Sequence, residues 1–240
     1  MLKVFIRLSL ILVIIFVCAT VIAQPKIDTA KASPISSRSS TGPKPYKDVI
    51  TAKAVTDEGL FNVHKVEEKY FLEIPDTLLG REILIVNRIS KSAAGMRSGF
   101  FGYAGDEIGR NVIRFEKGPN NKLFIRNISF AEYSKDSTSP MYTAVNNSNV
   151  QPIAAAFDIK AFSKDSTGSV IDLTDYISND NDVLFFSSQI KSALRIGSQQ
   201  SDKSYVTGVR SFPINIEIST VKTYSRMGGQ PGGGGGGPVG

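Results

Sequence analysis

The sequence predicts a mainly β protein with a few short helices (a β-rich α+β fold), built on an antiparallel sheet or sandwich that is incomplete at its C-terminus. Between Lys44 and Arg226, apolar residues mostly alternate with polar ones, which is the period of a half-buried strand. Short β-branched and aromatic runs are separated by Gly, Asn, Asp and Ser, which favour turns. The 240-residue chain is 41% hydrophobic and 21% charged, enough apolar material for one large domain or two small ones.

Each predicted strand is a short alternating run bounded by turn residues. Leu60–Val66 and Tyr70–Ile74 flank a polar segment and are predicted to form a hairpin. Gly118–Asn121 is a turn by composition, so the strands on either side of it are expected to pair antiparallel. The other predicted strands are Glu82–Ile89, Phe100–Tyr103, Asn111–Lys117, Lys122–Tyr133, Ala154–Phe162, Ser169–Leu173 and Ile214–Lys222.

Short helical pieces interrupt this pattern. Tyr46–Thr56 has apolar residues at helical spacing after two prolines. Asp76–Gly80 is predicted to be a single helical turn that ends at its glycine. Asp172–Ile177, with a Thr or Asp near a cap position, and Phe185–Leu194 are the other expected helices.

Three segments carry further expectations. Glu82–Ile89 is apolar on both faces, which is typical of a central strand. Ile214–Lys222 is followed only by a glycine-rich tract, so we expect it to pair with a strand further along the natural chain. The segment Ser134–Thr138 recurs as Ser163–Thr167, and we interpret both copies as the same kind of surface turn.

Composition divides the chain into five parts. A polar, small-residue stretch from Ser90 to Ser98 separates two β-rich segments. The glycines Gly232–Gly237 cannot hold a persistent element, because glycine loses the most backbone entropy on ordering. The predicted parts are a signal peptide at 1–23, a flexible spacer at 24–42, a small β-rich domain at 43–92, a second β-rich domain at 97–226 that is truncated, and a glycine-rich linker or loop at 227–240.

The N-terminus has the pattern of a secretory signal peptide. Lys3 and Arg7 precede an apolar run that ends in Val-Ile-Ala, so cleavage is expected between Ala23 and Gln24. The run is short for a membrane-spanning helix, and a polar segment containing proline follows it, which argues against an uncleaved anchor. We therefore expect an exported protein that is periplasmic, outer-membrane-associated or secreted, with no transmembrane segment after cleavage.

Charge and residue counts exclude several classes of site. The formal net charge is +6, or +4 after removal of Lys3 and Arg7, and it is spread too thinly to indicate a nucleic-acid partner. One histidine and one cysteine cannot supply most zinc, haem or iron–sulfur sites. Signal cleavage also removes Cys18, which leaves the mature chain without a thiol. We therefore predict no catalytic residue, no metal ligand and no cofactor in this chain.

The remaining motifs favour ordinary structural roles. His64 lies inside an alternating strand and is expected to be a strand residue. Ser188–Lys191 matches a Ser-x-x-Lys pattern, but the partner motifs of that enzyme class are missing. The acidic residues between Asp172 and Asp182 lack the Gly and the terminal Glu of a calcium loop. A short Asp-Ser/Thr pattern marks three candidate O-glycosylation sites, Thr77, Ser137 and Ser166.

Short segments spread along the chain carry a resemblance to a known family. They are Lys44–Ile50, Thr56–His64, Tyr70–Pro75, Leu78–Glu82, Val112–Glu116, Ile171–Asp175, Ser204–Val206 and Val209–Pro213. In order and spacing they resemble the N-terminal domains of a family of large secreted bacterial zinc-dependent metalloproteases. The resemblance covers about Lys44 to Val221.

The resemblance implies a context for the chain. In that family, two N-terminal regions of uncharacterised function precede a metzincin-like catalytic domain with a zinc-binding His-Glu-x-x-His helix. That motif is absent from this chain, so the family's catalytic and zinc residues map onto no position of it. The implied role is that of a propeptide-like or scaffolding region, whose partners are its own C-terminal catalytic domain, where the zinc would lie, and a protein or peptide substrate. The alternative is a stand-alone exported β-rich binding or surface module.

Overall fold

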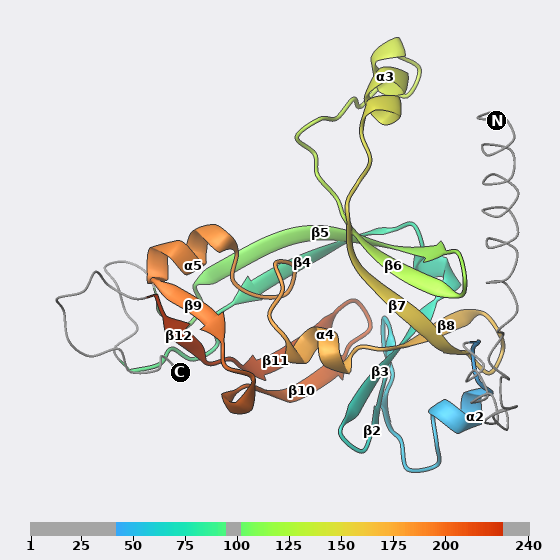
Figure 1. Ribbon diagram of the computed structural model, residues 1–240. Coiled ribbons are helices and arrows are strands. Elements are labelled where there is room, and N and C mark those ends of the chain that lie inside the picture. Colours follow the sequence, from blue (N-terminus) through green and yellow to red (C-terminus); the bar gives the residue numbers. More distant parts are fainter. Residues whose placement is uncertain (1–41, 95–101, 228–240) are drawn as a thin grey trace, which may run out of the picture. The chain divides into compact units, whose positions relative to one another are not determined.

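A large, curled antiparallel sheet organises the protein (Figure 1). The computed structural model describes residues 42–94 and 102–227, which all lie within Gly42–Gly240, one of the two units into which the chain divides. The strands of the sheet are β1 (Val55–Asp57), β2 (Asn62–Val66), β3 (Lys69–Pro75), β4 (Glu82–Arg88), β5 (Glu107–Gly118), β6 (Lys122–Asn127), β7 (Ile153–Phe162) and β8 (Gly168–Asp172). They follow the order β1-β2-β3-β8-β7-β6-β5-β4, and the prediction of a mainly β, antiparallel protein is confirmed.

Strands from the two predicted β-rich segments interleave in this sheet. β1 to β4 come from residues 43–92, and β5 to β8 come from residues 97–226. β8 pairs with β3 and β5 pairs with β4, so the later strands lie between two groups of earlier ones. The two segments therefore share one hydrogen-bonded sheet, and either segment by itself would leave strand edges unpaired.

One face of the sheet carries the main core. Because successive side chains of a strand point to opposite faces, Ile113 and Phe115 of β5 and Leu123 and Ile125 of β6 share this face, and all four are buried. Phe61 meets Phe115 edge to face, with 5.8 Å between the ring centroids. This contact joins the N-terminal strands to β5 across the core.

Smaller elements cover the core face. They are α4 (Thr174–Ser178), α5 (Ser188–Leu194), β9 (Ile196–Gln199), β10 (Tyr205–Ser211), β11 (Ile216–Val221) and β12 (Tyr224–Arg226). β10 pairs with β11, and α4 contacts both of them as well as β3. β9 pairs with β12, and Ile196 and Tyr224 from these strands form a second apolar cluster with Phe186.

The other helices lie outside this layer. α2 (Tyr46–Val49) packs on the opposite face of the sheet, where Tyr46 and Val49 meet a small cluster that includes Phe71 and Val170. α3 (Pro140–Ser148) lies within the connection between β6 and β7. The described residues also form the 3-10 turns η1 (Asp76–Leu78) and η2 (Ser201–Lys203). In the part of the chain that the structure describes, no helix has the length and apolarity needed to cross a membrane.

Local turn chemistry produces two hairpins where the sequence predicts them. β2 pairs with β3, and the chain reverses at Glu67, whose φ is 56°. β5 pairs with β6 around Asn120 and Asn121, with φ of 57° and 54°. Positive φ at both central positions suits the twist of a tight hairpin, and asparagine tolerates it. The predicted helical turn also forms, and Gly80 follows it at φ 74°, a region that favours glycine.

The two copies of the Ser-Lys-Asp-Ser-Thr segment share a pair of side-chain hydrogen bonds, but their backbone turns differ. The Ser139 N–H donates to the Asp136 carbonyl after the first copy, whereas the Ser166 N–H donates to the Ser163 carbonyl within the second. The prediction of one kind of turn therefore holds only for the side-chain bonds. In the first copy, the Asp136 carboxylate accepts hydrogen bonds from the Thr138 backbone N–H at 2.9 Å and hydroxyl at 2.7 Å. In the second, the Asp165 carboxylate accepts the same pair from Thr167, at 3.1 and 2.7 Å. The Thr138 bonds lower the pKa of the Asp136 carboxyl. A hydrogen bond from the Ser163 hydroxyl, followed by the Thr167 bonds, lowers the pKa of the Asp165 carboxyl, because each bond stabilises the charged form.

Several predicted elements have different bounds in the structure. The helix expected at Tyr46–Thr56 ends at Val49, since the backbone of Ile50 is no longer helical, and Thr56 belongs to β1, opposite His64. The strand expected at Lys122–Tyr133 ends at Asn127. The Asn127 N–H donates to the carbonyl of Pro152, and proline has no N–H with which to continue the ladder of hydrogen bonds. The strand expected at Phe100–Tyr103 begins outside the described residues, and its described part is not a strand.

The prediction that Glu82–Ile89 is a central strand is wrong. β4 is the last strand of the sheet and pairs only with β5 there. Ile83 and Ile85 pack against the core, whereas Leu84 and Val86 on the other face are 59% and 40% exposed. The apolar side chains on its second face therefore lie on the outer surface of the sheet, and the strand is not buried on both sides.

Ile214–Lys222 already has a partner in this chain, contrary to the premise of the expectation above, and a later strand beside it stays a prediction. This segment forms β11, which pairs with β10 in a register that places Val209 opposite Ile218. The sequence does not predict β10, because Gly208 and a register shift between Val206 and Gly208 interrupt its alternating pattern. An earlier segment of the same chain therefore pairs with one edge of this strand.

Candidate functional site

The single histidine belongs to a buried polar cluster. His64 on β2 is 3% exposed. Its Nδ1 lies 2.8 Å from the Thr56 hydroxyl on β1, and its Nε2 lies 3.1 Å from a carboxylate oxygen of Glu73 on β3. The Tyr46 hydroxyl of α2 donates to the same Glu73 oxygen at 2.9 Å. The cluster therefore joins α2 and three neighbouring strands.

The electrostatics of this cluster favour a structural role. The hydrogen bond from His64 holds the pKa of the Glu73 carboxyl below its usual range, and burial raises the pKa of Tyr46. Both ring nitrogens of His64 have partners, and the imidazole is closed to solvent. Sequence reasoning placed His64 correctly in a strand but missed these partners. The hairpin register could have identified Glu73 as a partner, because it sets Glu73 opposite Asn62, which lies on the same face of β2 as His64.

A second polar cluster lies between α4 and the C-terminal strands. The Lys222 ammonium donates to the carbonyl oxygens of Ile177, at 2.9 Å, and Ser178, and it lies 4.1 Å from the centroid of the Phe185 ring. Asp180 accepts from Lys191 at 2.6 Å and from the Tyr224 hydroxyl at 3.1 Å. Lys222 thereby satisfies carbonyl groups at the end of α4.

Burial lowers the pKa of Lys222 from 10.5 to about 8, and this shift gives a testable pH dependence. Between these values the unfolded chain binds more protons at this position than the folded chain, so stability rises with pH across that window. We expect wild-type protein to gain stability relative to Lys222→Met between about pH 8 and pH 10, because the variant cannot titrate there. Urea unfolding at several pH values measures this difference. Parallel pH curves for the two proteins would contradict it.

The acidic residues considered for calcium do not gather into a site. Asp172 accepts from the Thr174 backbone N–H at 3.0 Å and pairs with Lys69 at 3.5 Å. The Asp180 carboxylate accepts hydrogen bonds from Lys191 and Tyr224, as described above. Across residues 42–94 and 102–227, no group of three or more His, Cys, Asp or Glu side chains is placed to hold a metal ion.

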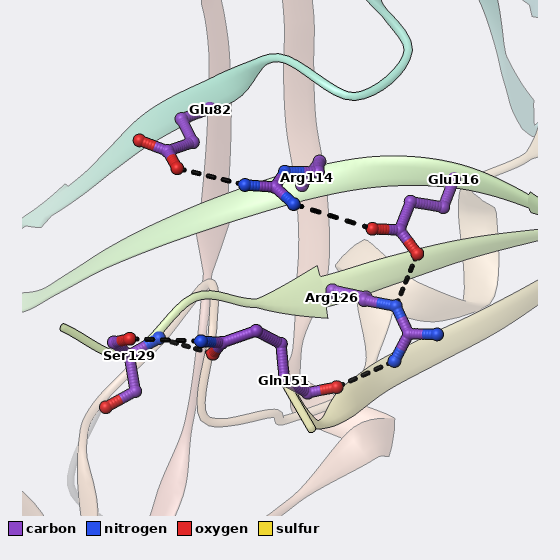
Figure 2. A network of polar contacts seen from close by, with 6 residues as sticks. All are labelled: Glu82, Arg114, Glu116, Arg126, Ser129 and Gln151. Atoms are coloured by element: carbon purple, nitrogen blue, oxygen red, sulfur yellow. Dashed lines mark hydrogen bonds and ion pairs between the residues drawn. The ribbon is translucent and has the colours of Figure 1, made fainter. Parts of the chain in front are cut away.

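A chain of ionic contacts crosses the outer face of the sheet (Figure 2). Arg114 of β5 lies 3.0 Å from Glu82 of β4 and 3.8 Å from Glu116. Glu116 in turn pairs with Arg126 of β6. The Arg126 guanidinium then donates to the backbone carbonyl of Gln151 at 2.7 Å. Both arginines are thus committed to carboxylates, which lowers their availability to an external anion.

This chain of contacts ends at the base of a long connection between β6 and β7. The Gln151 side chain accepts from the Ser129 backbone N–H at 2.8 Å and donates to the Ser129 carbonyl at 3.1 Å (Figure 2). Asn127 and Pro152 close the base with a 3.0 Å backbone hydrogen bond. We call residues 128–152 the arm. The bonds between Gln151 and Ser129 close the arm on itself, and three others fix its root to the sheet: Asn127 N–H to the Pro152 carbonyl, Ile128 N–H to the Val112 carbonyl, and Arg126 to the Gln151 carbonyl.

The arm exposes apolar side chains. α3 lies at its tip, away from the sheet, and has no buried residue (Figure 1). Phe130 and Tyr133 stack edge to face at 5.9 Å while remaining 49% and 62% exposed. The other large exposed apolar residues of the arm are Met141, Tyr142 and Val150. Adjacent antiparallel strands are usually joined by two to five residues or so, and much longer connections are commonly functional.

The residues singled out from the sequence are not brought together. Ala23 and Gln24, the predicted cleavage site, lie outside the described residues. Thr77 lies in η1, Ser137 in the first repeated turn and Ser166 in the second, and all three are exposed. Their O-glycosylation stays a prediction.

The fold and these surfaces define a β-rich protein with a curled antiparallel sheet and an apolar arm. Residues 105–236 match the model of a family described as a domain of unknown function, DUF5117, and residues 43–92 match a second such domain, DUF5118. The first match spans more than half of the chain, so the protein belongs to the DUF5117 family. Neither a curated protein nor a solved structure matches the chain.

Proposed function

We propose that this chain is a non-catalytic, propeptide-like or scaffolding region of an exported zinc-dependent metalloprotease, which binds the catalytic domain of the same protein. The observation that carries the proposal is the arm, whose exposed aromatic side chains and uncovered helix are typical of a surface that contacts another protein. The sequence resemblance supplies the kind of protein to which the partner belongs. The signal-peptide pattern supports export.

The energetics of α3 support a partner at the arm. A helix of this length is marginal in water unless one of its faces is packed against something. α3 spans Pro140–Ser148 and buries none of its residues in the described structure. Met141 and Tyr142 are 62% and 37% exposed and would supply a contact face. A partner that covers these side chains would stabilise the helix.

The residues of this chain do not fit a zinc ion. His64 is its single histidine, and both nitrogens of that ring have partners. A zinc site needs several such ligands around one position. In the proposed function the zinc therefore belongs to the catalytic domain.

One observation favours the alternative of a stand-alone exported binding or surface module. β11 pairs with β10, so this strand has a partner within the described residues. The genomic sequence after the Gly240 codon separates the two functions. A reading frame that continues into a His-Glu-x-x-His helix supports the metalloprotease, and a stop codon leaves the stand-alone module.

Substitution of the arm tests its role as the contact surface. Tyr133→Ala, Met141→Ala and Tyr142→Ala combined should weaken binding of the catalytic domain, expressed separately from the same gene, by roughly 30-fold, because aromatic anchors dominate protein interfaces. Isothermal titration calorimetry measures the affinity.

The matched control removes exposed apolar side chains elsewhere. Tyr205 and Ile214 are 58% and 87% exposed but lie outside the arm, and Tyr205→Ala with Ile214→Ala should leave the affinity unchanged. Equal loss in both variants, or none in either, would exclude the arm as the contact surface.

A further inference from the structure

Among the residues that the structure describes, two strand edges have no sheet partner and line a common groove. β1 is the terminal strand of the large sheet, and β10 pairs only with β11 in its own sheet. The groove is lined by the consecutive residues 55–57 of β1 and 207–210 of β10. Successive side chains of a strand point to opposite faces, so an uninterrupted run of lining residues means that the strand presents its backbone edge. Unpaired backbone groups at such an edge are a template for another strand.

Side chains of β2 and β3 also line the groove. They are Val63, Lys65 and Tyr70, and the groove has a volume of about 440 Å³. Next to the lining residues of β10, the Ser211 N–H donates to the Asp57 carboxylate at 2.9 Å, and the Ser211 hydroxyl donates to the Phe61 carbonyl at 2.6 Å. These bonds hold β10 against the chain that follows β1. The volume lies in the range of pockets that bind small ligands and suits a few residues of an extended chain.

The groove carries two cations with no ion-pair partner. Lys65 and Arg210 both line it, both are exposed, and within residues 42–94 and 102–227 neither lies within 4.0 Å of a carboxylate. Glu217 is opposite Arg210 in the register of β10 and β11, yet no ion pair joins them. Asp57 has the one carboxylate among the lining residues, and that carboxylate accepts a hydrogen bond from the Ser211 N–H. The unpaired charge at the groove is therefore positive.

We propose that this groove binds an extended peptide segment that carries a carboxylate. The peptide backbone pairs with the free edge of β1 or β10, and its carboxylate lies between Lys65 and Arg210. Main-chain pairing supplies affinity, as in other cases of strand addition, and the two cations select acidic peptides. This site is independent of the arm and of the proposed metalloprotease, so an experiment that refutes one of the two proposals leaves the other unaffected.

Binding of defined peptides to the full chain tests the proposal. The probes are short N-acetylated peptides of alternating threonine and valine in three forms: a central glutamate with an amidated C-terminus, a central glutamine with a free C-terminal carboxylate, and a central glutamine with an amidated C-terminus. At least one carboxylate form should bind roughly tenfold more tightly than the neutral form, measured by calorimetry. The comparison of the two acidic forms tells a side-chain carboxylate from a terminal one. Equal affinity of all three forms would overturn the selection of acidic peptides.

Two further measurements make the test specific to the groove. Lys65→Ala with Arg210→Ala should abolish the preference for a carboxylate, whereas Arg81→Ala with Lys91→Ala, an equal change of charge outside the groove, should preserve it. Bound peptide should also slow hydrogen exchange of backbone amides in β1 or β10. Unchanged exchange in both strands, or equal loss in the two double variants, would overturn the proposal.

Discussion

Replacement of Phe61 with alanine is expected to lower the free energy of unfolding by about 3–5 kcal/mol, which is typical of a buried phenylalanine. Phe61 is 2% exposed and packs edge to face on Phe115 of β5, so its removal leaves a cavity between the N-terminal strands and the centre of the sheet. Its carbonyl also accepts the Ser211 hydroxyl, a bond that a displaced backbone would lose. Urea denaturation followed by circular dichroism measures the change.

An exposed phenylalanine provides the control. Phe130 on the arm is 49% exposed, and Phe130→Ala should change the stability of the isolated chain by less than about 0.5 kcal/mol. A similar loss in both variants would mean that the core does not centre on the contact between Phe61 and Phe115.

The second large effect is expected at Gly59. A Cβ atom at this position would lie 2.5 Å from the Ser211 hydroxyl oxygen and 2.6 Å from the Phe212 carbonyl oxygen. Leu60 donates to that same carbonyl at 2.7 Å, so the backbones have no room to separate without breaking the bond. We expect Gly59→Ala to cost about 1–3 kcal/mol, as in other cases of overpacking, and to loosen the contact of β10 with the chain that follows β1. Thermal unfolding and hydrogen exchange of the β10 amides measure the two effects.

Gly208 on β10 is the matched control for this substitution. A Cβ atom there meets nothing within 4 Å, and its backbone is not in the left-handed region. Gly208→Ala should therefore be neutral or stabilise slightly, because alanine restricts the unfolded chain more than glycine does. If Gly59→Ala were equally neutral, the close approach of β10 to the chain after β1 would not exist in solution.

Local chemistry explains the parts of the fold that the sequence predicts well. Asn120 and Asn121 accept the positive φ that a tight hairpin requires, and they define the turn between β5 and β6. Asp136 and Asp165 accept hydrogen bonds from threonines two residues later, so both copies of the repeat form the same side-chain contact. Such features depend on residues close together in the chain, and sequence patterns report them directly.

The sequence did not reveal the candidate sites, because their parts are distant in the chain. The groove combines β1 with β10, which are separated by most of the chain, and β10 itself was missed. The arm was missed because the segment after Asn127 continues the apolar pattern of β6 while leaving the sheet, and because α3 has no strong periodic face. The partners of His64 were missed because Tyr46 and Glu73 reach it from other elements.

The sequence by itself determined that the chain forms short antiparallel strands and where many of them turn, because the alternation of side chains and the φ preferences of turn residues are local properties. Only the tertiary structure decided which strands are neighbours. β4 lies at an edge despite its two apolar faces, and β3 pairs with β8 across about a hundred residues of sequence. Any two alternating strands can form a ladder, so the choice among partners depends on how all side chains of the core face pack at once, with Phe61 meeting Phe115 and β10 resting on Gly59.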